Sequence, residues 1–241
     1  MEQPSKKAII VGASSGIGWA LAYVLAAEGY TVGLCARRLA RLSQLQADIG
    51  SKSFISLKDI TSKDVFEDFE DFLQSQGTVD LVVISAGIGH INSKLSWKLE
   101  KETIDVNVKG FTAVADASMQ FFMKQGYGHL AGISSMASFR GNASAPAYNA
   151  SKAYVSNYLE GLRLIAAKNK LPIHITDIRP GFVLTEMAKG EKIFWAATPK
   201  KAALQIYAAI RKHKKVAYVT RRWRLVAWAM RILPECIYRH F

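Results

Sequence analysis

Two side chains in the second half of the sequence could move a proton together. Tyr148 and Lys152 are four residues apart, so on a helix they would lie on one face. A free tyrosine has a pKa of about 10 and is a poor acid or base near neutrality. A neighbouring ammonium favours the phenolate and lowers that pKa. The pair therefore predicts a general acid/base with Tyr148 exchanging the proton; the alternative is a solvated surface pair.

A glycine-rich segment near the N-terminus could hold a pyrophosphate. Residues 12–18 read GASSGIG, between an apolar run and a helical pattern. Glycines permit a tight turn and a close approach of the backbone, and a helix N-terminus offers free N–H groups. The spacing is G-x-x-x-G-x-G and not G-x-G-x-x-G. A dinucleotide is predicted here, although the segment could be only a turn. The predicted contacts are Gly12, Ser14, Ser15, Gly16, Ile17 and Gly18.

Two arginines follow the second apolar run and could select the dinucleotide. Residues 31–35 are followed by Ala36, Arg37 and Arg38. An acidic residue at this place would bind the ribose 2′-hydroxyl of NAD, whereas arginine suits the 2′-phosphate of NADP. The sequence therefore predicts NADP(H), with Arg37 as the first candidate and Arg38 as the second. The alternative is a pair of solvated arginines.

The elements that would position these residues alternate along the chain. Strand-like runs at 7–11, 31–35, 54–57, 79–84, 130–133, 173–178 and 216–219 are separated by helical patterns, including a long one near 99–124. This alternation predicts an α/β fold, a doubly wound parallel sheet of about seven strands with helices on both faces. Ligands bind beyond the carboxyl ends of such strands, where the glycine segment falls.

The spacing of Tyr148 and Lys152 is a Y-x-x-x-K motif. Together with the glycine segment it resembles the short-chain dehydrogenase/reductase family over residues 6–186. Further markers follow in the family's order: Asp59, Asn107, Ser134-Ser135 and Pro180-Gly181. The resemblance implies a Rossmann-like fold, a nicotinamide cofactor and a reaction that interconverts a carbonyl and an alcohol.

The resemblance also implies roles for single residues. Ser135 would bind the substrate oxygen, with Ser134 as the alternative, and Lys152 would also hold the nicotinamide ribose. Asn107 would support a water in a proton relay. Asp59 would bind the adenine amino group; the alternative is a helix cap near Thr61 and Ser62. The remaining implied cofactor contacts are Ile60, Ser85, Ala86, Gly87, Pro180, Gly181, Val183 and Thr185.

One segment departs from the family pattern. The family has Asn-Asn-Ala-Gly after its fourth strand, and this chain has Ile84-Ser85-Ala86-Gly87. The loss of both asparagines puts the local support of the sheet in doubt more than the catalysis.

The substrate is expected to be a small molecule, a lipophilic carbonyl or alcohol. The segment 182–198 lies where the family has its substrate lid and contains Phe182, Leu184, Met187, Ile193, Phe194 and Trp195. These side chains could equally pack among themselves. Reduction is the favoured direction because NADPH is usually the reducing form in cells. Two rival interpretations are an NADP(H)-binding sensor and a membrane-associated scaffold, each with little turnover.

The charge of the chain is concentrated at its end. The net charge is +13, and twelve Lys or Arg against one acid from Lys192 onward supply +11 of it. Residues 221–234 add Trp and Leu, with Leu225, Trp228 and Ile232 at helical spacing. We expect a catalytic domain over 1–220 and a basic, aromatic helical tail over 221–241. The tail would lie on an anionic membrane surface or pack on the domain or on a partner subunit; nucleic acid is disfavoured because no recognised module accompanies the charge.

Cysteine use and the N-terminus bear on the compartment. Cys35 and Cys236 predict neither a disulfide framework nor a metal site and fit a reducing compartment. No secretory leader precedes the first strand, and no run reaches the roughly 18–20 apolar residues of a membrane span. A cytoplasmic protein is expected, in peripheral contact with the inner face of a membrane if the tail binds lipid. The oligomeric state is left open, with a homo-oligomer as one alternative.

Overall fold

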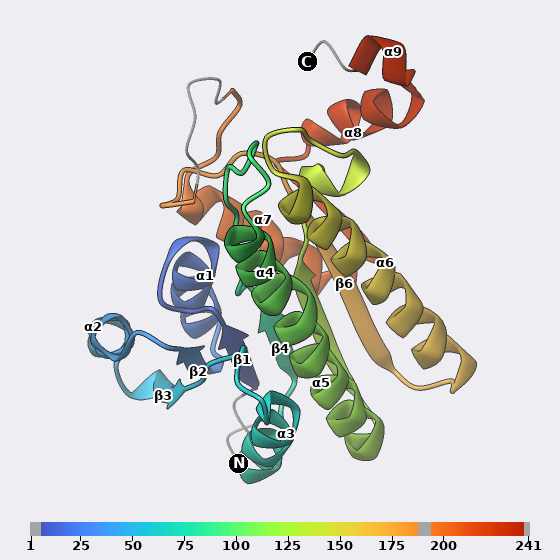
Figure 1. Ribbon diagram of the computed structural model, residues 1–241. Coiled ribbons are helices and arrows are strands. Elements are labelled where there is room, and N and C mark those ends of the chain that lie inside the picture. Colours follow the sequence, from blue (N-terminus) through green and yellow to red (C-terminus); the bar gives the residue numbers. More distant parts are fainter. Residues whose placement is uncertain (1–5, 188–193, 239–241) are drawn as a thin grey trace.

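The computed structural model describes residues 6–187 and 194–238 (Figure 1). Its centre is a seven-stranded, all-parallel sheet in the order β3-β2-β1-β4-β5-β6-β7, which confirms the predicted doubly wound α/β fold. The strands are β1 (Lys7–Val11), β2 (Thr31–Ala36), β3 (Ser53–Leu57), β4 (Leu81–Ile84), β5 (Gly128–Ile133), β6 (Ile173–Pro180) and β7 (Val216–Val219). The strand order reverses between β1 and β4, and ligands bind at such a switch point.

Helices cover both faces of the sheet because successive strand residues point to opposite sides. Ile10 and Leu34 belong to the core beneath one helical layer, and Ile9 and Val82 belong to the core beneath the other. The first layer is α1 (Gly16–Ala27), α2 (Leu39–Ile49) and α7 (Pro199–Arg211); the second is α3 (Val65–Ser75), α5 (Phe111–Gln125) and α6 (Pro146–Lys168). Strands buried on both faces explain the near-continuous apolar runs of the sequence.

The predicted long helix near 99–124 is divided into three parts. They are α4 (Trp97–Ile104), a π-helical segment η2 (Asp105–Gly110) and α5. The wider turn contains Asn107, and its last residue, Gly110, packs so closely on the backbone of Ile60 that a side chain would collide with it. Short π-helical segments inside helices are frequent at functional sites.

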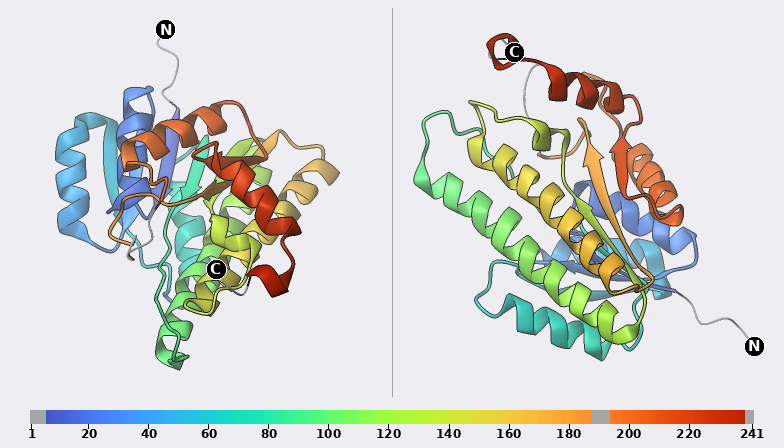
Figure 2. Two further views of the ribbon diagram at one scale, coloured as in Figure 1. Left: turned by 90° about the horizontal axis from the view of Figure 1, so that it is seen from above. Right: turned by 90° about the vertical axis from the view of Figure 1, so that its right-hand side faces the viewer.

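The chain ends in two short helices beyond β7. They are α8 (Trp223–Ile232) and α9 (Glu235–Tyr238), and they lie at the end of the molecule opposite the N-terminus (Figures 1 and 2). The 3-10 turns η1 (Gly50–Lys52) and η3 (Met136–Phe139) complete the described elements. Among the described residues, no helix has the length and apolar character needed to cross a membrane.

Candidate active site

The glycine-rich segment forms a tight turn between β1 and α1. Gly12 and Gly16 have φ angles of 93° and 57°, in the left-handed region that favours glycine. A side chain on Gly12 would collide with the backbone of Ala86, and one on Gly18 with the carbonyl of Gly12. The first turn of α1 holds no acidic residue, and Ser15 makes no side-chain cap. The turn therefore has the close backbone approach and the free helix N-terminus that a pyrophosphate requires.

The two candidate arginines point to different places. Arg38 donates from Nε to the Ser14 hydroxyl at 3.1 Å and from Nη2 to the Ser15 hydroxyl at 2.7 Å. Arg37 instead lies with Nη1 4.0 Å from the Asp59 carboxylate at the end of β3. The structure thus brings Arg38, the second candidate, to the glycine turn.

Asp59 stabilises a local turn, and the helix cap that the sequence offered as an alternative is wrong because α3 begins only at Val65. Its Oδ1 accepts hydrogen bonds from the Thr61 amide at 2.9 Å and the Thr61 hydroxyl at 2.7 Å. Burial opposes ionisation of this carboxyl, but the bonds from Thr61 and the charge of Arg37 lower its pKa on balance. Asp59 and the buried Ile60 line a hollow of about 280 Å³ at the carboxyl end of β3.

Tyr148 and Lys152 lie on one face of α6, which begins at Pro146 with a proline suited to a first helical turn. Lys152 is buried, and its Nζ donates to the Ile133 carbonyl at 3.0 Å, 5.8 Å from the centre of the Tyr148 ring. A Cβ on Gly87 would lie 3.1 Å from Lys152 Nζ and 3.3 Å from Asn107 Oδ1. The loop after β4 therefore meets the proposed proton-transfer groups where a side chain would not fit without a shift.

The expected lowering of the Tyr148 pKa is wrong. Burial raises the pKa of Tyr148, and the Ser135 hydroxyl beside it offsets only part of that effect. Burial also lowers the pKa of Lys152 to about 8, against the opposing charge of Asp177. Partial burial of Tyr148 and full burial of Lys152 disfavour both charged forms, which the four-residue spacing could not reveal. Tyr148 therefore holds its proton near neutral pH.

The two neighbouring serines have different surroundings. Ser134 is buried and donates to Asp177 Oδ1 at 2.5 Å, while Asp177 Oδ2 accepts from Arg179 Nε at 2.7 Å. Ser135 accepts from the Ala137 amide at 3.0 Å and is the serine that acts on Tyr148. The geometry favours Ser135 as the substrate-facing hydroxyl and makes Ser134 part of an internal network that the sequence analysis did not identify.

Asn107 ties the π-helical segment to the loop after β4. Its Oδ1 accepts from the Ile88 amide at 2.8 Å, and its Nδ2 donates to the Ile88 carbonyl at 2.7 Å and to Ser151 Oγ at 3.0 Å. Its Oδ1 and the Lys152 Nζ both lie close to Gly87; the water-supporting role that the resemblance implies for Asn107 stays a prediction.

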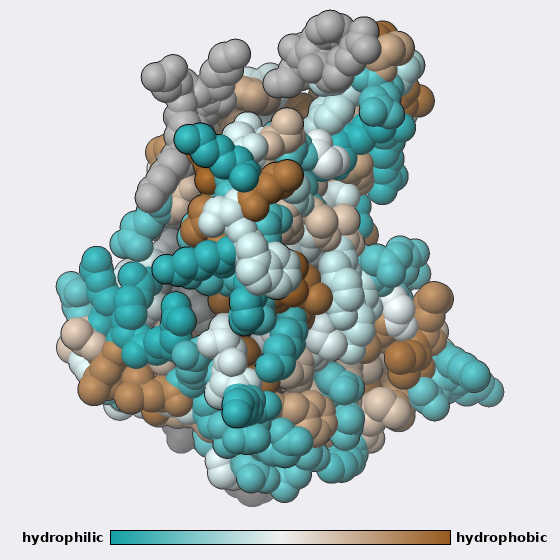
Figure 3. All heavy atoms as spheres, viewed as in Figure 1, coloured by the Kyte–Doolittle hydropathy of each residue, from teal (hydrophilic) through white to brown (hydrophobic). Residues whose placement is uncertain are grey.

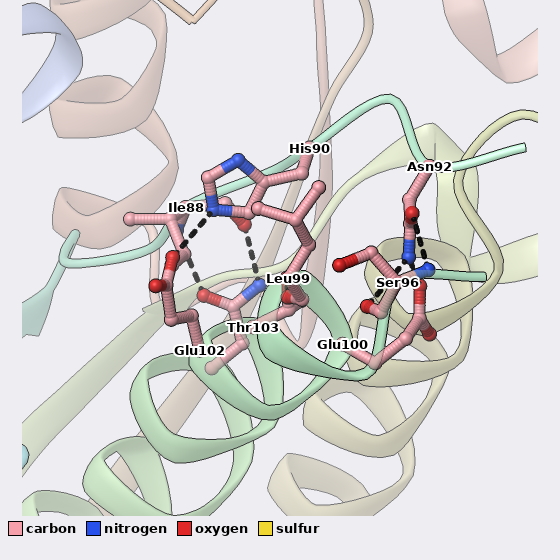
Figure 4. A network of polar contacts seen from close by, with 9 residues as sticks. Ile88, His90, Asn92, Ser96, Leu99, Glu100, Glu102 and Thr103 are labelled. Carbon is pink, nitrogen blue, oxygen red and sulfur yellow. Dashed lines mark hydrogen bonds and ion pairs between the residues drawn. The ribbon is translucent and has the colours of Figure 1, made fainter. Parts of the chain in front are cut away.

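The same loop is anchored to α4 by further polar contacts (Figure 4). The Asn92 side chain donates to the Ser96 carbonyl at 3.1 Å and accepts from the Ser96 amide at 2.8 Å. His90 Nε2 lies 3.5 Å from the Glu102 carboxylate. The sequence analysis missed Asn92, although an asparagine four residues before a serine that precedes a helix is a usable signal.

The segment that departs from the family pattern is supported by its backbone. Ile84 is fully buried, and the amides of Ser85 and Ala86 both donate to the Val11 carbonyl at 2.8 Å. Strand pairing and core packing therefore hold this part of the sheet without the asparagine side chains.

The loop after β6 approaches the glycine turn from the other side. The Gly181 amide donates to the Val219 carbonyl at 2.6 Å, and Val183 is buried. A Cβ on Gly16 would lie 3.2 Å from Thr185 Cγ2. The residues that follow Pro180, the last residue of β6, thus reach the turn formed by residues 12–18.

Four aromatic rings gather beside this loop. Phe182 and Phe194 lie 5.6 and 5.2 Å from Trp223 of α8, centre to centre, and Trp195 lies 6.3 Å from it. We refer to these four rings as the aromatic cluster. Leu184 and Met187 are exposed, and Ile193 lies outside the described residues. Trp223 was not among the predicted site residues, because the sequence placed it in a tail outside the domain.

The sequence of the chain is similar to those of known proteins. Residues 6–193 match the sequence profile of the family described as short chain dehydrogenase. An uncharacterized oxidoreductase of Myxococcus xanthus is 36% identical over 193 residues, which cover 77% of this chain and 75% of that protein. One of Mycobacterium tuberculosis is 32% identical over 248 aligned positions, 98% of this chain and 97% of that protein.

The fold is also that of solved structures. The crystal structure of a variant of actinorhodin polyketide ketoreductase with NADPH superposes with a TM-score of 0.79 at 23% identity, covering 90% of this chain and 97% of that one. At this identity the likeness concerns the fold. The profile match and the two curated relatives carry the assignment: the chain belongs to the short-chain dehydrogenase/reductase family of oxidoreductases.

Proposed function

We propose that the protein is an NADPH-dependent reductase that converts a carbonyl to an alcohol, with Tyr148 as the proton donor. The observation that carries this proposal is that Tyr148 meets both Ser135 and Lys152, with Gly87 beside Lys152, at the sheet edge that also holds the glycine turn. A protonated tyrosine at neutral pH suits the donor role in reduction.

Each proton step uses a group of this chain. The Ser135 hydroxyl donates a hydrogen bond to the carbonyl oxygen and stabilises its developing negative charge. The Tyr148 hydroxyl then gives its proton to that oxygen, while a bound reduced nicotinamide would supply the hydride. The Lys152 ammonium stabilises the resulting phenolate, and its own pKa of about 8 suits it to return a proton near neutrality. Asn107 would support the proton relay, because its side chain fixes the backbone of Ile88 through two hydrogen bonds.

Several positions fit NADP(H) as the cofactor. The glycine turn would hold the pyrophosphate, with Ser85, Ala86 and Gly87 opposite it. Arg38, and next Arg37, would bind the 2′-phosphate. Asp59 and Ile60 would meet the adenine, and the loop from Pro180 to Thr185 would meet the nicotinamide side. Arg38→Asp should weaken NADPH binding at least about tenfold and NADH binding far less. Equal losses for both cofactors would remove Arg38 from this role.

The aromatic cluster favours a lipophilic substrate. Phe182, Phe194 and Trp195 are 38%, 51% and 46% exposed, so their rings are only partly used in packing on Trp223. Exposed rings next to a catalytic cleft can bury an apolar chain at about 25 cal/mol per Å². The two interpretations of segment 182–198 are therefore compatible, because its rings pack together and still offer apolar surface to a substrate.

The rival functions are a nucleotide sensor and a scaffold with little turnover. Neither needs a buried lysine beside a tyrosine and a serine, and burying an unpaired ammonium is costly. A panel of carbonyl compounds of increasing chain length, followed by loss of NADPH absorbance, tests the proposal. We expect turnover that rises with chain length and is lost in Tyr148→Phe, while NADPH binding persists. Turnover that survives in Tyr148→Phe would refute the assigned role.

A further inference from the structure

Helix α8 has one face that is fixed to the domain. Trp223 and Ala227 are buried, and Val226 and Met230 are partly buried against Met136 of η3. Further bonds secure the end of the helix. Arg140 donates to the carbonyls of Met230 and Leu233, and the Tyr238 hydroxyl donates to the Gly141 carbonyl at 2.8 Å. Helices α8 and α9 are therefore packed on the domain.

The other face of α8 presents apolar side chains to solvent. Leu225, Trp228 and Ile232 are 70%, 68% and 59% exposed, and their spacing of three and four residues puts them on one side of the helix. We call these three residues the outer stripe. Folding has already buried the apolar residues of the inner face, so core packing does not account for the stripe. When one face of a helix packs on its domain and a second apolar face is exposed, the exposed face is a candidate contact surface.

Cations surround the outer stripe. Arg221, Arg222 and Arg224 come just before it in the sequence and are exposed. The guanidinium carbon of Arg222 lies 5.1 Å from the centre of the Trp195 ring, which joins α8 to the aromatic cluster. In the part of the chain that the structure describes, Glu235 is the one acidic residue from 221 to 238. The surface thus combines an apolar ridge with positive charge.

This combination distinguishes among possible occupants. Two copies meeting through this face would bring like charges together, which opposes a symmetric dimer. A nucleic acid would use the arginines but leave the outer stripe in water. A bilayer with anionic lipid uses both, because its headgroups attract the arginines and its acyl boundary accepts Trp and Leu side chains.

The view in Figure 3 adds a contrast. Over most of the face shown, hydrophilic side chains dominate and the hydrophobic ones form small separate patches. We propose that the outer stripe of α8 and its flanking arginines bind the surface of a membrane that contains anionic lipid.

The position of α8 gives this surface a consequence for the active site, which rests on the proposed function. Trp223 of the same helix packs on Gly181 and on the other rings of the aromatic cluster, beside the loop after β6. Docking α8 on a bilayer would bring the exposed Leu184, Phe194 and Trp195 to the lipid side. Substrates dissolved in the membrane would then enter without crossing water.

Vesicle co-sedimentation of the full chain tests the proposal. The probes are phosphatidylcholine vesicles and vesicles that also contain phosphatidylserine. The variants are Leu225→Ser with Ile232→Ser, and Arg221→Gln with Arg224→Gln. The control is Leu164→Ser, which replaces a leucine of α6 that is 67% exposed. Because each cation near an anionic surface contributes about 1 kcal/mol, the double arginine variant should lose roughly thirty-fold in partitioning.

The outcomes separate this proposal from the proposed function. Binding that needs phosphatidylserine and is lost in both double variants but kept in the control supports it. Equal binding of parent and variants, or absence of binding by the parent, overturns it. A dimer in sedimentation velocity that the stripe variant abolishes would assign the surface to a second copy and also overturns it. The variant with Leu225→Ser and Ile232→Ser should reduce a water-soluble carbonyl compound as fast as the parent does. If neither the parent nor any variant reduces it, the proposed enzymatic function is refuted, but the membrane-binding surface is not.

Discussion

The indole ring of Trp223 lies directly on the backbone of Gly181. A methyl group added to Gly181 would overlap the ring, and Trp223 is only 4% exposed. The first residue of α8 thus supports the loop after β6, and the Gly181 amide is bonded to the Val219 carbonyl at the end of β7. Helix α8 and the loop proposed to meet the nicotinamide therefore pack together.

Trp223→Ala should destabilise the protein and impair the site. Removing a buried tryptophan costs about 3–5 kcal/mol, because the lost packing leaves a cavity. Trp228→Ala is the matched control, since that ring is 68% exposed and its loss should cost under about 1 kcal/mol. Urea unfolding measures both values. Equal small losses would mean that α8 contributes little to the folded state.

Glu186 should compete with the cofactor for Arg38. Its carboxylate lies 3.5 Å from Arg38 Nη1 and 3.8 Å from Arg41 Nη2. A 2′-phosphate bound by Arg38 would have to replace this contact. Glu186→Gln should therefore tighten NADPH binding by about two- to fivefold, as expected for exposed ion pairs. NADH, which lacks that phosphate, should bind as before in a fluorescence titration. A weaker NADPH affinity in the variant would contradict this competition.

The sequence predicted the sheet well because both of its faces are buried. The run 81–84 is apolar and buried throughout, as suits a strand covered by two helical layers, and glycines mark the turn after β1. The Y-x-x-x-K spacing then located Tyr148 and Lys152, since a helix fixes which residues share a face.

Features that depend on distant contacts escaped prediction. The pKa directions of Tyr148 and Lys152 follow from burial, which the local spacing does not contain. Arg37 and Arg38 are neighbours, so only the turn into α2 decides which one reaches the glycine segment. The contact between Trp223 and Gly181 joins segments that are 42 residues apart (223 − 181).

Lys152→Met should abolish turnover and yet stabilise the fold at neutral pH. The folded-state pKa of Lys152 is about 8 and the unfolded value is 10.5. Below pH 8 the folded protein carries a buried ammonium, and between pH 8 and 10.5 the unfolded chain binds the additional proton. Wild-type stability should therefore rise through this window by about 3 kcal/mol, and the variant should lack that rise.

Tyr148→Phe is the control for this comparison. It removes the proton donor but leaves Lys152 in place, so its stability should still rise from this lysine between pH 8 and 10.5. Denaturant unfolding at several pH values measures all three proteins. A Lys152→Met protein that is less stable than wild type at pH 7 would show that the bond from Lys152 to the Ile133 carbonyl outweighs the cost of burying its charge.

Three histidine rings at the far end of the sheet should make the fold sensitive to acid. Burial, followed by the charges of the nearby His213 and His174, lowers the pKa of His129 to about 3. Below pH 6.5 the unfolded chain takes up a proton at this residue and the folded chain does not, so stability falls from pH 6.5 toward pH 3. At pH 5 the loss from His129 alone should be about 2 kcal/mol.

His129→Gln should remove most of this loss, because glutamine does not titrate and retains a partner for the Thr176 hydroxyl, which lies 2.8 Å from His129 Nε2. His174→Gln is the matched control: His174 is exposed on the same sheet edge and its pKa is also lowered, first by burial and then by His213. This variant should change the loss of stability below pH 6.5 less than His129→Gln does, since water screens the charge of an exposed imidazole. The midpoint of urea unfolding, measured at pH 7 and pH 5, compares the variants. If His174→Gln reduces the loss of stability at pH 5 more than His129→Gln does, the exposed His174 and not the buried His129 causes the acid sensitivity.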